Sequence, residues 1–297
     1  MAVCNICPRM CGIDRSVNVG MCGAEDNPFV ARAALHHWEE PPISGTNGSG
    51  AVFFCGCNMR CVFCQNHEIS VGHVGRQMDA EALCEVYFAL QSDGAHNINL
   101  VTPTPHTKLL ASSIKKAKEK GITIPFVWNT NAYELVDTLK MLEGLVDIYL
   151  PDLKYVSAER AREYSGTENY FDYAAPAILE MYRQVGTLQI QCGIAMRGLI
   201  IRHLILPNNV DESRRVLDWI ADHLPMQTQI SLMRQYTPMH RVRREPQKFK
   251  HLQRKITSRE YDRAIDYALS LGLQNVFIQG AKSANDSFTP LFDGTVL

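Results

Sequence analysis

A large net charge, membrane-length apolar runs and low-complexity segments are all missing from this sequence. Its 30 Lys and Arg residues nearly balance its 31 Asp and Glu residues, and the resulting net charge of −1 gives no reason to expect nucleic acid or an anionic membrane as a partner. No apolar stretch approaches the length of a membrane span, and the first residues, Met-Ala-Val-Cys-Asn, lack the apolar stretch of a signal peptide. We therefore expect a cytoplasmic protein. Without repeats or Gly/Ser linkers, the chain predicts one core domain.

Cysteine, in contrast, is plentiful, with ten residues in 297. In a chain that is not exported, this number favours metal or redox chemistry over disulfides. The most informative three are Cys57, Cys61 and Cys64, which form a CxxxCxxC triplet. Three thiolates can bind three irons of a [4Fe-4S] cluster and leave the fourth iron open to a small molecule, so the triplet predicts such a cluster. The alternative is three buried structural thiols.

Patterns typical of strands and helices alternate through the middle of the chain. The expected strands are 51–54, 98–101, 124–128, 146–150, 199–206 and 229–233, with a short one at 276–278. The expected helices are 79–92, 108–120, 133–142, 172–183, 211–224 and a last one opened by a capping box of Thr257 and Glu260. About six βα units predict an α/β fold, a partial (β/α)6 barrel whose functional groups lie on loops at the carboxyl ends of parallel strands.

We expect this barrel to span 46–240, with a Cys-rich extension over 1–45 packed on it and a C-terminal extension of the same domain over 241–297. The second extension begins with a basic run, 241–255, which has seven Lys or Arg residues and one Glu. This run is either a solvated loop or a docking surface for a protein partner or an acidic substrate. Because Phe249 is its one aromatic residue, nucleic acid is not expected to bind there.

The triplet directly follows an apolar strand, and the aromatic residue Phe63 stands just before its last cysteine. In both respects the sequence resembles the radical S-adenosylmethionine (SAM) superfamily. Over nearly its whole length it is similar to the glycyl-radical-enzyme activating branch, in particular to homologues of pyruvate formate-lyase activating enzyme. The other motifs that carry this resemblance are Glu39-Glu-Pro-Pro, Trp128-Asn-Thr-Asn131, Asp152-Leu-Lys154 and Arg202-His203.

The resemblance implies a reaction. SAM would bind the open iron through its amino and carboxylate groups, and an electron from the reduced cluster would cleave it into a 5′-deoxyadenosyl radical that abstracts hydrogen. In the activating branch the hydrogen comes from a glycine of a partner glycyl radical enzyme, and the electron comes from a flavodoxin- or ferredoxin-type donor in an anaerobic cytoplasm. Because fold and cofactor do not fix the substrate, two alternatives stay open. One is a radical SAM enzyme that modifies a small molecule, peptide or nucleotide, and the other is an electron-transfer or metal-scaffold protein.

The resemblance also assigns residues to SAM. Phe63 would lie against the adenine. Asp152 and Lys154 would lie against bound SAM, where a carboxylate accepts hydrogen bonds and an ammonium pairs with a carboxylate. The alternative for Asp152 is a turn residue after a proline. His203 would form a hydrogen bond to SAM, unless it is a satisfied core histidine, and Arg202 is expected to point outward as a surface residue.

Two family features are altered in this sequence. Asn129-Thr130 stands where the family has an Asp-Thr pair that helps to bind a monovalent cation beside SAM, so one negative charge is missing. The family's Gly-Gly-Glu, which holds the amino nitrogen of SAM, is replaced by Val-Thr-Pro-Thr-Pro. The hydroxyls of Thr102 and Thr104 can accept hydrogen bonds from an ammonium, so we expect them to take over that task.

A second group of thiols stands near the N-terminus, at Cys4, Cys7, Cys11 and Cys22. Four thiolates satisfy either a tetrahedral zinc ion or a complete [4Fe-4S] cluster, and neither leaves a position open for catalysis. Matching cysteines occur in the homologues that the chain resembles. The site is therefore predicted to be either a zinc clip that staples the N-terminus or a cluster that relays electrons.

Overall fold

Parallel strands form the centre of the fold in the computed structural model, which describes residues 3–280, 283–284 and 289–296. Within these residues the sheet has ten strands, in the order β10-β9-β8-β6-β5-β4-β2-β1-β3, with β7 paired to β8. The parallel strands are β2 (Ser49–Phe54), β4 (Ile98–Val101), β5 (Phe126–Thr130), β6 (Ile148–Pro151), β8 (Ile194–Leu204), β9 (Gln229–Met233) and β10 (Val276–Ile278). Every predicted strand is present, and the predicted α/β fold with a partial barrel is confirmed.

Each edge of the sheet includes a strand from one of the two segments, 1–45 and 241–297, that were predicted as extensions. β1 (Phe29–His36) pairs antiparallel with β2, and β3 (Arg76–Gln77) pairs with β1. At the other edge β10 pairs with β9, and the chain then returns so that Val296 forms a bridge with Ala33 of β1. β7 (Gln189–Gln191) forms a hairpin with β8. These segments supply main-chain partners to sheet edges that would otherwise be open.

Helices cover the outer face of the sheet. The predicted ones are α3 (Ala80–Ser92), α4 (Thr107–Glu119), α5 (Val136–Lys140), α7 (Tyr170–Val185), α8 (Val210–His223) and α10 (Ser258–Ser270). The side chain of Asp79 caps α3 by accepting hydrogen bonds from the main-chain N–H groups of Glu81 and Ala82. The predicted capping box of Thr257 and Glu260 opens α10.

Several short elements were not predicted. They are α1 (Pro41–Ser44), α2 (His67–Val71), α6 (Ala158–Ser165), α9 (His240–Arg244) and the 3-10 turns η1 (Thr104–His106) and η2 (Lys250–Leu252). Most of them are too short to show a helical repeat of apolar residues. α5 is shorter than predicted because residues 131–135 form a loop, in which Ala132 has a positive φ of 63°.

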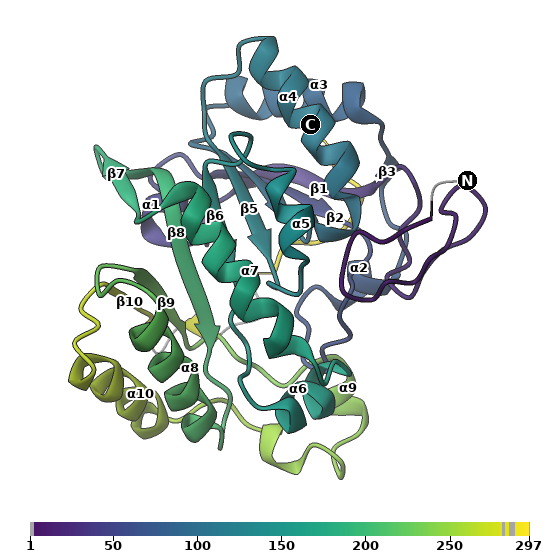
Figure 1. Cartoon of the computed structure of the whole chain (residues 1–297). Helices are drawn as coiled ribbons and strands as arrows, with labels where there is room; N and C mark the ends of the chain where they lie inside the picture. Colours follow the sequence, from purple (N-terminus) through teal and green to yellow (C-terminus); the bar gives the residue numbers. More distant parts are fainter. Residues whose placement is uncertain (1–2, 281–282, 285–288, 297) are drawn as a thin grey trace.

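The core lies between the helices and the sheet. In Figure 1, α3 and α4 cover one end of the sheet, α8 and α10 cover the other, and α7 crosses between them. Tyr87 of α3 packs edge-on against Phe126 of β5, with the ring centroids 5.3 Å apart, and both side chains are fully buried. No helix in the described part of the chain is both long enough and apolar enough to cross a membrane.

The N-terminal segment, residues 3–28, consists of loops without a helix or strand and lies beside α2 (Figure 1, dark purple). It is nevertheless anchored to the core. Its Ile6 is buried, and the carbonyl of Ile6 accepts a hydrogen bond of 2.9 Å from Thr138 Oγ1. The carbonyl of Gly23 lies 2.6 Å from the ring nitrogen Nε2 of His73. A buried side chain, Thr138, and an exposed one, His73, therefore hold this segment in place.

Candidate functional site

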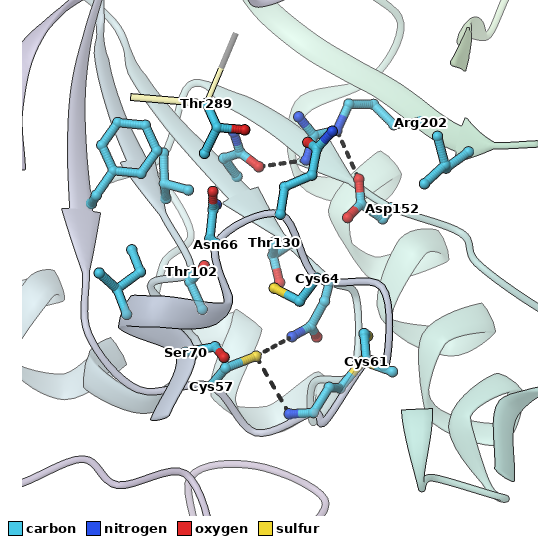
Figure 2. Close-up of a pocket in the computed structure, with 18 of the residues that line it drawn as sticks. Cys57, Cys61, Cys64, Asn66, Ser70, Thr102, Thr130, Asp152, Arg202 and Thr289 are labelled. Atoms are coloured by element: carbon cyan, nitrogen blue, oxygen red, sulfur yellow. Dashed lines mark hydrogen bonds and ion pairs between the residues drawn. The ribbon is translucent and has the colours of Figure 1, made fainter. Parts of the chain in front are cut away.

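A cavity of about 220 Å³ lies where the parallel strands end. Its lining includes the three cysteines of the triplet after β2, Thr102 after β4, the last two residues of β5, Asp152 after β6 and Arg202 near the end of β8. Figure 2 shows the triplet on one side of the cavity and Asp152 with Arg202 on another. Thr289 of the C-terminal segment also lines it. The carboxyl ends of parallel strands are where such folds carry functional groups, as predicted.

The loop after β2 brings the triplet to this cavity. Cys57 Sγ accepts hydrogen bonds from a main-chain N–H at 3.4 Å and from the side-chain amide of Asn131 at 3.5 Å. Cys61 Sγ lies 3.1 Å from Ser165 Oγ. Burial raises the pKa of Cys57 to about 11 and that of Cys64 to about 12, and neighbouring thiols add to the rise. Metal binding at these side chains must therefore displace protons.

A buried network of charged side chains lines the same cavity. Asp152 accepts a hydrogen bond from Lys154 Nζ at 2.7 Å through Oδ2, and one from Arg202 Nε at 2.8 Å through Oδ1. The Arg202 guanidinium also donates to Glu39 Oε2 at 3.3 Å and to Asn129 Oδ1 at 2.6 Å. Burial acts to raise the pKa of Asp152, but the Arg202 and Lys154 cations lower it below its usual value. Asp152 is therefore a carboxylate at neutral pH.

Lys154 links this network to the triplet. Burial acts to lower the pKa of Lys154, but the Asp152 carboxylate raises it, so the side chain stays an ammonium. Burial dominates the pKa values of Cys57 and Cys64, and the Lys154 charge acts on both thiols in the opposite direction. A cation and a carboxylate side by side near the cysteines can pair with the carboxylate and the ammonium of a zwitterionic ligand.

Thr104 of η1 and Thr130 at the end of β5 both donate hydrogen bonds to the buried side chain of Glu134. Glu134 Oε1 accepts hydrogen bonds from Thr104 Oγ1 at 2.5 Å, from Thr130 Oγ1 at 2.9 Å and from Trp128 Nε1 at 3.0 Å. Thr130 lines the cavity, whereas Thr104 is buried and does not. Of the two threonines predicted to face the amino group of SAM, the structure brings only Thr102 to the cavity. Thr102 has a φ of 61°, which is rare for a β-branched residue and is a kind of strain that clusters at functional sites.

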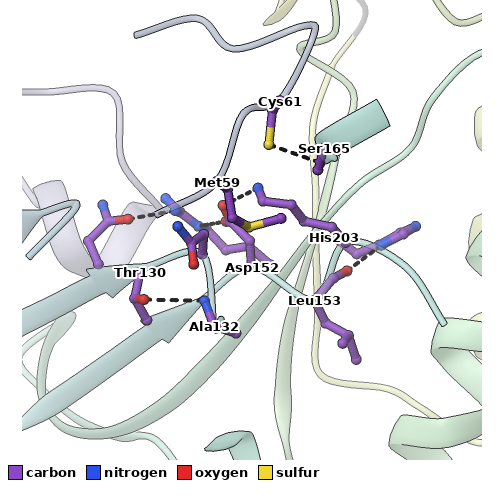
Figure 3. Close-up of polar contacts among 12 residues, drawn as sticks. Met59, Cys61, Thr130, Ala132, Asp152, Leu153, Ser165 and His203 are labelled. Atoms are coloured by element: carbon purple, nitrogen blue, oxygen red, sulfur yellow. Dashed lines mark hydrogen bonds and ion pairs between the residues drawn. The ribbon is translucent and has the colours of Figure 1, made fainter. Parts of the chain in front are cut away.

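Arg202 and His203 point to opposite faces of β8, and the contacts of His203 match the predicted alternative of a satisfied core histidine. Arg202 lines the cavity, so the prediction that it is a surface residue is wrong. His203 is buried outside the cavity lining, with Nδ1 2.8 Å from the carbonyl oxygen of Leu153 (Figure 3). Its Nε2 lies 2.9 Å from Ser213 Oγ. Successive residues of a strand point to opposite faces, so placing Arg202 inside turns His203 away.

Phe63 lines the cavity beside the triplet. Its ring lies edge-on to Tyr164 and Tyr236, with centroid distances of 6.5 and 6.0 Å. These two rings fix the position of Phe63 at the cavity wall. Its contact with adenine stays a prediction.

The four N-terminal thiols are neighbours in space. Burial raises the pKa of Cys7 to about 11, and the nearby thiols of Cys22 and Cys4 contribute to the rise. A side chain at position 20 would begin 3.2 Å from Cys11 Sγ and 3.8 Å from Cys22 Sγ, and this position holds Gly20. The structure therefore brings the four predicted ligands into one part of the N-terminal segment, with space kept open beside two of the sulfurs.

The donor sets can be tested against the cofactors that they would hold. In the described part of the chain, no three Cys, His, Asp or Glu side chains converge as the ligands of one metal ion do. The ligands of a [4Fe-4S] cluster bind different irons and need not converge on one point. Cys57, Cys61 and Cys64 fit such a cluster because they line one cavity, and because Cys57 and Cys61 have polar hydrogen-bond partners at their sulfurs.

Three further residues of the site were missed by sequence reasoning. Glu39 belongs to the Glu39-Glu-Pro-Pro motif, which carried the resemblance but received no role, and a pair of acids just before the first barrel strand could have been a signal. Asn131 and Ser165 lie 74 and 104 residues along the chain from the cysteines that they contact. No local spacing connects them with the triplet.

The basic run forms α9 and the loops after it. Glu245 pairs with Arg241 at 2.8 Å and with Lys248 at 3.5 Å, and Arg254 pairs with Glu260 at 2.7 Å. Acidic neighbours thus partly neutralise the run. Its use as a docking surface stays a prediction.

Comparison with known proteins agrees with this fold and site. A family model described as the radical SAM superfamily matches residues 51–220, which is more than half of the chain. An uncharacterized protein of Methanocaldococcus jannaschii is 29% identical over 283 residues, which cover 92% of this chain and 76% of the relative. A second uncharacterized protein of the same organism is 25% identical over 251 residues, which cover 78% of this chain and 69% of that relative.

Two solved structures are similar in fold. One is Streptococcus suis SuiB bound to its precursor peptide SuiA, with a TM-score of 0.51 and 12% identity over 75% of this chain and 46% of SuiB. The other is HydG, a maturase of the [FeFe]-hydrogenase, with a TM-score of 0.52 and 13% identity over 74% of this chain and 48% of HydG. The chain spans about half the length of these proteins, and at such low identity the likeness shows the fold alone. None of these matches reaches the glycyl-radical activating branch. The family match over 51–220, which has the triplet near its start, directly after β2, shows that this protein belongs to the radical SAM superfamily.

Proposed function

We propose that this radical SAM enzyme holds a [4Fe-4S] cluster on Cys57, Cys61 and Cys64 and abstracts a hydrogen atom from a polypeptide. Its leading target is a glycine of a partner glycyl radical enzyme. One observation carries the proposal: the triplet and the network of Asp152, Lys154 and Arg202 line the same cavity. When bound, the reduced cluster and SAM supply the 5′-deoxyadenosyl radical that takes the hydrogen. The side chains of the cavity bind and orient the reactants.

Five side chains would orient SAM. The Lys154 ammonium would donate to the carboxylate of SAM, and the Asp152 carboxylate would accept from its amino group or from a ribose hydroxyl. Thr102 and Thr130 offer hydroxyls at the ends of neighbouring strands, and Phe63 offers a ring. The network is already assembled, with Lys154 Nζ 2.7 Å from Asp152 Oδ2, so binding would require little rearrangement of these charges.

The neighbours of the cysteine sulfurs would tune the cluster. Asn131 donates to Cys57 Sγ, and the Ser165 hydroxyl lies within hydrogen-bond distance of Cys61 Sγ. Hydrogen bonds to ligand sulfurs change the reduction potential of iron–sulfur clusters. These two residues would thus influence how readily the cluster accepts the electron that cleaves SAM.

Arg202 would take the place expected for a monovalent cation. Its guanidinium lies 2.8 Å from Asp152 Oδ1 and 2.6 Å from Asn129 Oδ1, so a fixed positive charge compensates the carboxylate. The Kd for SAM should therefore change less than about twofold when KCl is exchanged for choline chloride at equal ionic strength. A tenfold weaker Kd in choline chloride would contradict this assignment and indicate a bound monovalent ion.

The position of the cavity favours a polypeptide over a small-molecule substrate. It lies at the ends of the parallel strands, where SAM would occupy the inner part and a second reactant would approach from the loop side. The reacting hydrogen would then be presented from outside, as a loop of a partner protein can do. The basic residues of 241–255 would attract an acidic surface of that partner, and a flavodoxin- or ferredoxin-type protein would supply the electron.

Deuterium transfer tests the target directly. Glycyl radical enzymes from the same cell would be produced with glycine deuterated at Cα and mixed anaerobically with the reconstituted protein, SAM and a reductant. We expect an electron paramagnetic resonance (EPR) signal of a glycyl radical on one of them, narrowed to an unresolved line because the hydrogen that remains on Cα is deuterium. We also expect a single deuterium in the 5′-deoxyadenosine, because the abstracted atom ends on its 5′ carbon.

Two controls accompany this experiment. Unlabelled partner should give a doublet EPR signal, split by the hydrogen that remains on Cα, with no deuterium in the nucleoside. Deoxyadenosine that forms without any protein radical, but together with a modified metabolite or peptide, would contradict the activating role and support the alternative of a modification enzyme.

Substitutions of Lys154 and His203 should distinguish a residue that lines the cavity from a residue that is buried outside it. Lys154→Met should weaken SAM binding about 10- to 100-fold, because it removes a charge-assisted hydrogen bond worth about 1.5–3 kcal/mol. His203→Gln should change the Kd less than about twofold, because both ring nitrogens of His203 bond to the protein outside the cavity lining. Isothermal titration of the reconstituted protein with SAM measures both effects. Equal losses in the two variants would place His203 at SAM after all.

A further inference from the structure

The N-terminal segment lies directly on the loop that carries the triplet. The main-chain N–H of Cys57 donates to the carbonyl of Cys22 at 3.1 Å. Arg9 Nε donates to the carbonyl of Asn58 at 2.8 Å, and the guanidinium of Arg60 donates to a carbonyl of the N-terminal segment. A single main-chain hydrogen bond therefore joins Cys22, one of the N-terminal thiols, to Cys57 of the triplet.

The N-terminal thiols extend from the protein surface toward that contact. Cys11 is exposed, Cys4 is half-buried, and Cys7 and Cys22 are buried. Gly20 sits where a Cβ atom would lie 3.2 Å from Cys11 Sγ, so a larger residue would crowd the sulfur. The four thiols thus form one group with an outer side at Cys11 and an inner side at Cys22.

A cross-link would add to the contacts that anchor the loops of 3–28 to the core. In this segment the structure shows no helix or strand, and none of its cysteines is in a disulfide. A short segment without a regular hydrogen-bonded framework gains the free energy to stay folded from a disulfide or a bound metal. The four thiols are the residues of this segment suited to bind such a metal.

We propose that Cys4, Cys7, Cys11 and Cys22 bind a second [4Fe-4S] cluster, which passes single electrons to the cluster at the triplet. This proposal rests on the proposed function of the triplet. Four protein ligands leave no iron open, so this cluster would not bind SAM and would act in electron transfer. The path runs from Cys22 through its carbonyl and the 3.1 Å hydrogen bond to Cys57.

The electron balance of this step is simple. A low-potential one-electron donor reduces the N-terminal cluster from the 2+ to the 1+ state at the exposed side near Cys11. That cluster returns to 2+ when it reduces the triplet cluster from 2+ to 1+, and no bond or proton changes place. A zinc ion at the same thiols would staple the segment but could not carry an electron, because zinc has no redox chemistry.

Metal content tests the identity of the site without altering its ligands. After anaerobic reconstitution with iron and sulfide, the unaltered protein should hold about eight irons, and C57A/C61A/C64A should hold about four irons, about four sulfides and no zinc. Reduction of that variant should give the EPR signal of a [4Fe-4S]+ cluster. Zinc in place of iron, or no metal at all, would overturn the proposal. Because this readout needs no SAM, it is independent of whether the proposed function is right.

Electron delivery tests the role of the site. Cys11→Ser should slow reduction of the triplet cluster by a reduced flavodoxin at least about tenfold, as judged by stopped-flow absorbance. Reduction by titanium(III) citrate, a small molecule that can reach the triplet cluster itself, should change less than about twofold. Cys192→Ser is the matched control, since Cys192 is also an exposed free thiol and lies in the β7–β8 turn. Equal flavodoxin rates in C11S and C192S would overturn the relay.

Discussion

The variant in which Cys57, Cys61 and Cys64 are all replaced by alanine is expected to form no 5′-deoxyadenosine from SAM. These three thiols line the cavity, and without them no side chain of the triplet loop can hold iron there. The loss should be complete rather than partial, because cleavage of SAM requires both the open iron and the electron that the cluster delivers. Liquid chromatography of reactions with SAM and titanium(III) citrate measures the product.

Cys192→Ala is the control for this variant, because it removes a free thiol from the β7–β8 turn. It should cleave SAM at the rate of the unaltered protein. Deoxyadenosine formation by the triple variant, at a rate above that of reductant and SAM alone, would mean that the cluster is held elsewhere.

Asp152→Ala is expected to weaken SAM binding at least about tenfold and also to destabilise the protein. The substitution leaves the Arg202 guanidinium and the Lys154 ammonium buried without their shared carboxylate, which lies 2.8 and 2.7 Å from them. Breaking a buried ion pair in this way costs about 3–5 kcal/mol of folding free energy. The pKa of Asp152 is lowered in the folded state, so its contribution is present at neutral pH and is lost in acid, as the pH falls through that lowered pKa.

Denaturant titration without SAM and isothermal titration with SAM separate the two effects. Asp137→Ala is the matched control, because Asp137 pairs with Lys140 at 2.9 Å but is 90% exposed, and such pairs contribute about 0–1 kcal/mol. Normal SAM affinity together with a loss of stability in Asp152→Ala would show that Asp152 is a structural turn residue.

The framework of the fold could be predicted because its signals are local. The apolar run before Cys57 and the capping box of Thr257 and Glu260 each lie within a few residues and correspond to β2 and the start of α10 in the structure. Strand β1 could not be assigned in the same way. It belongs to the sheet because it pairs with β2 and because the tail returns to it at Val296, and these contacts depend on the whole chain.

The sequence by itself determined which residue types come together at the site. The spacing of the triplet could be read along the chain, and so could the position of Asp152 and Lys154 in a loop at the carboxyl end of a strand. The tertiary structure decided which face each side chain takes. Arg202 faces the cavity and His203 faces away from it, because successive residues of a strand point to opposite faces of the sheet. An error of one residue in the assumed register therefore assigns every side chain of the strand to the wrong face. The tertiary structure also placed Cys22 against Cys57, a contact between segments 35 residues apart that no spacing along the chain encodes.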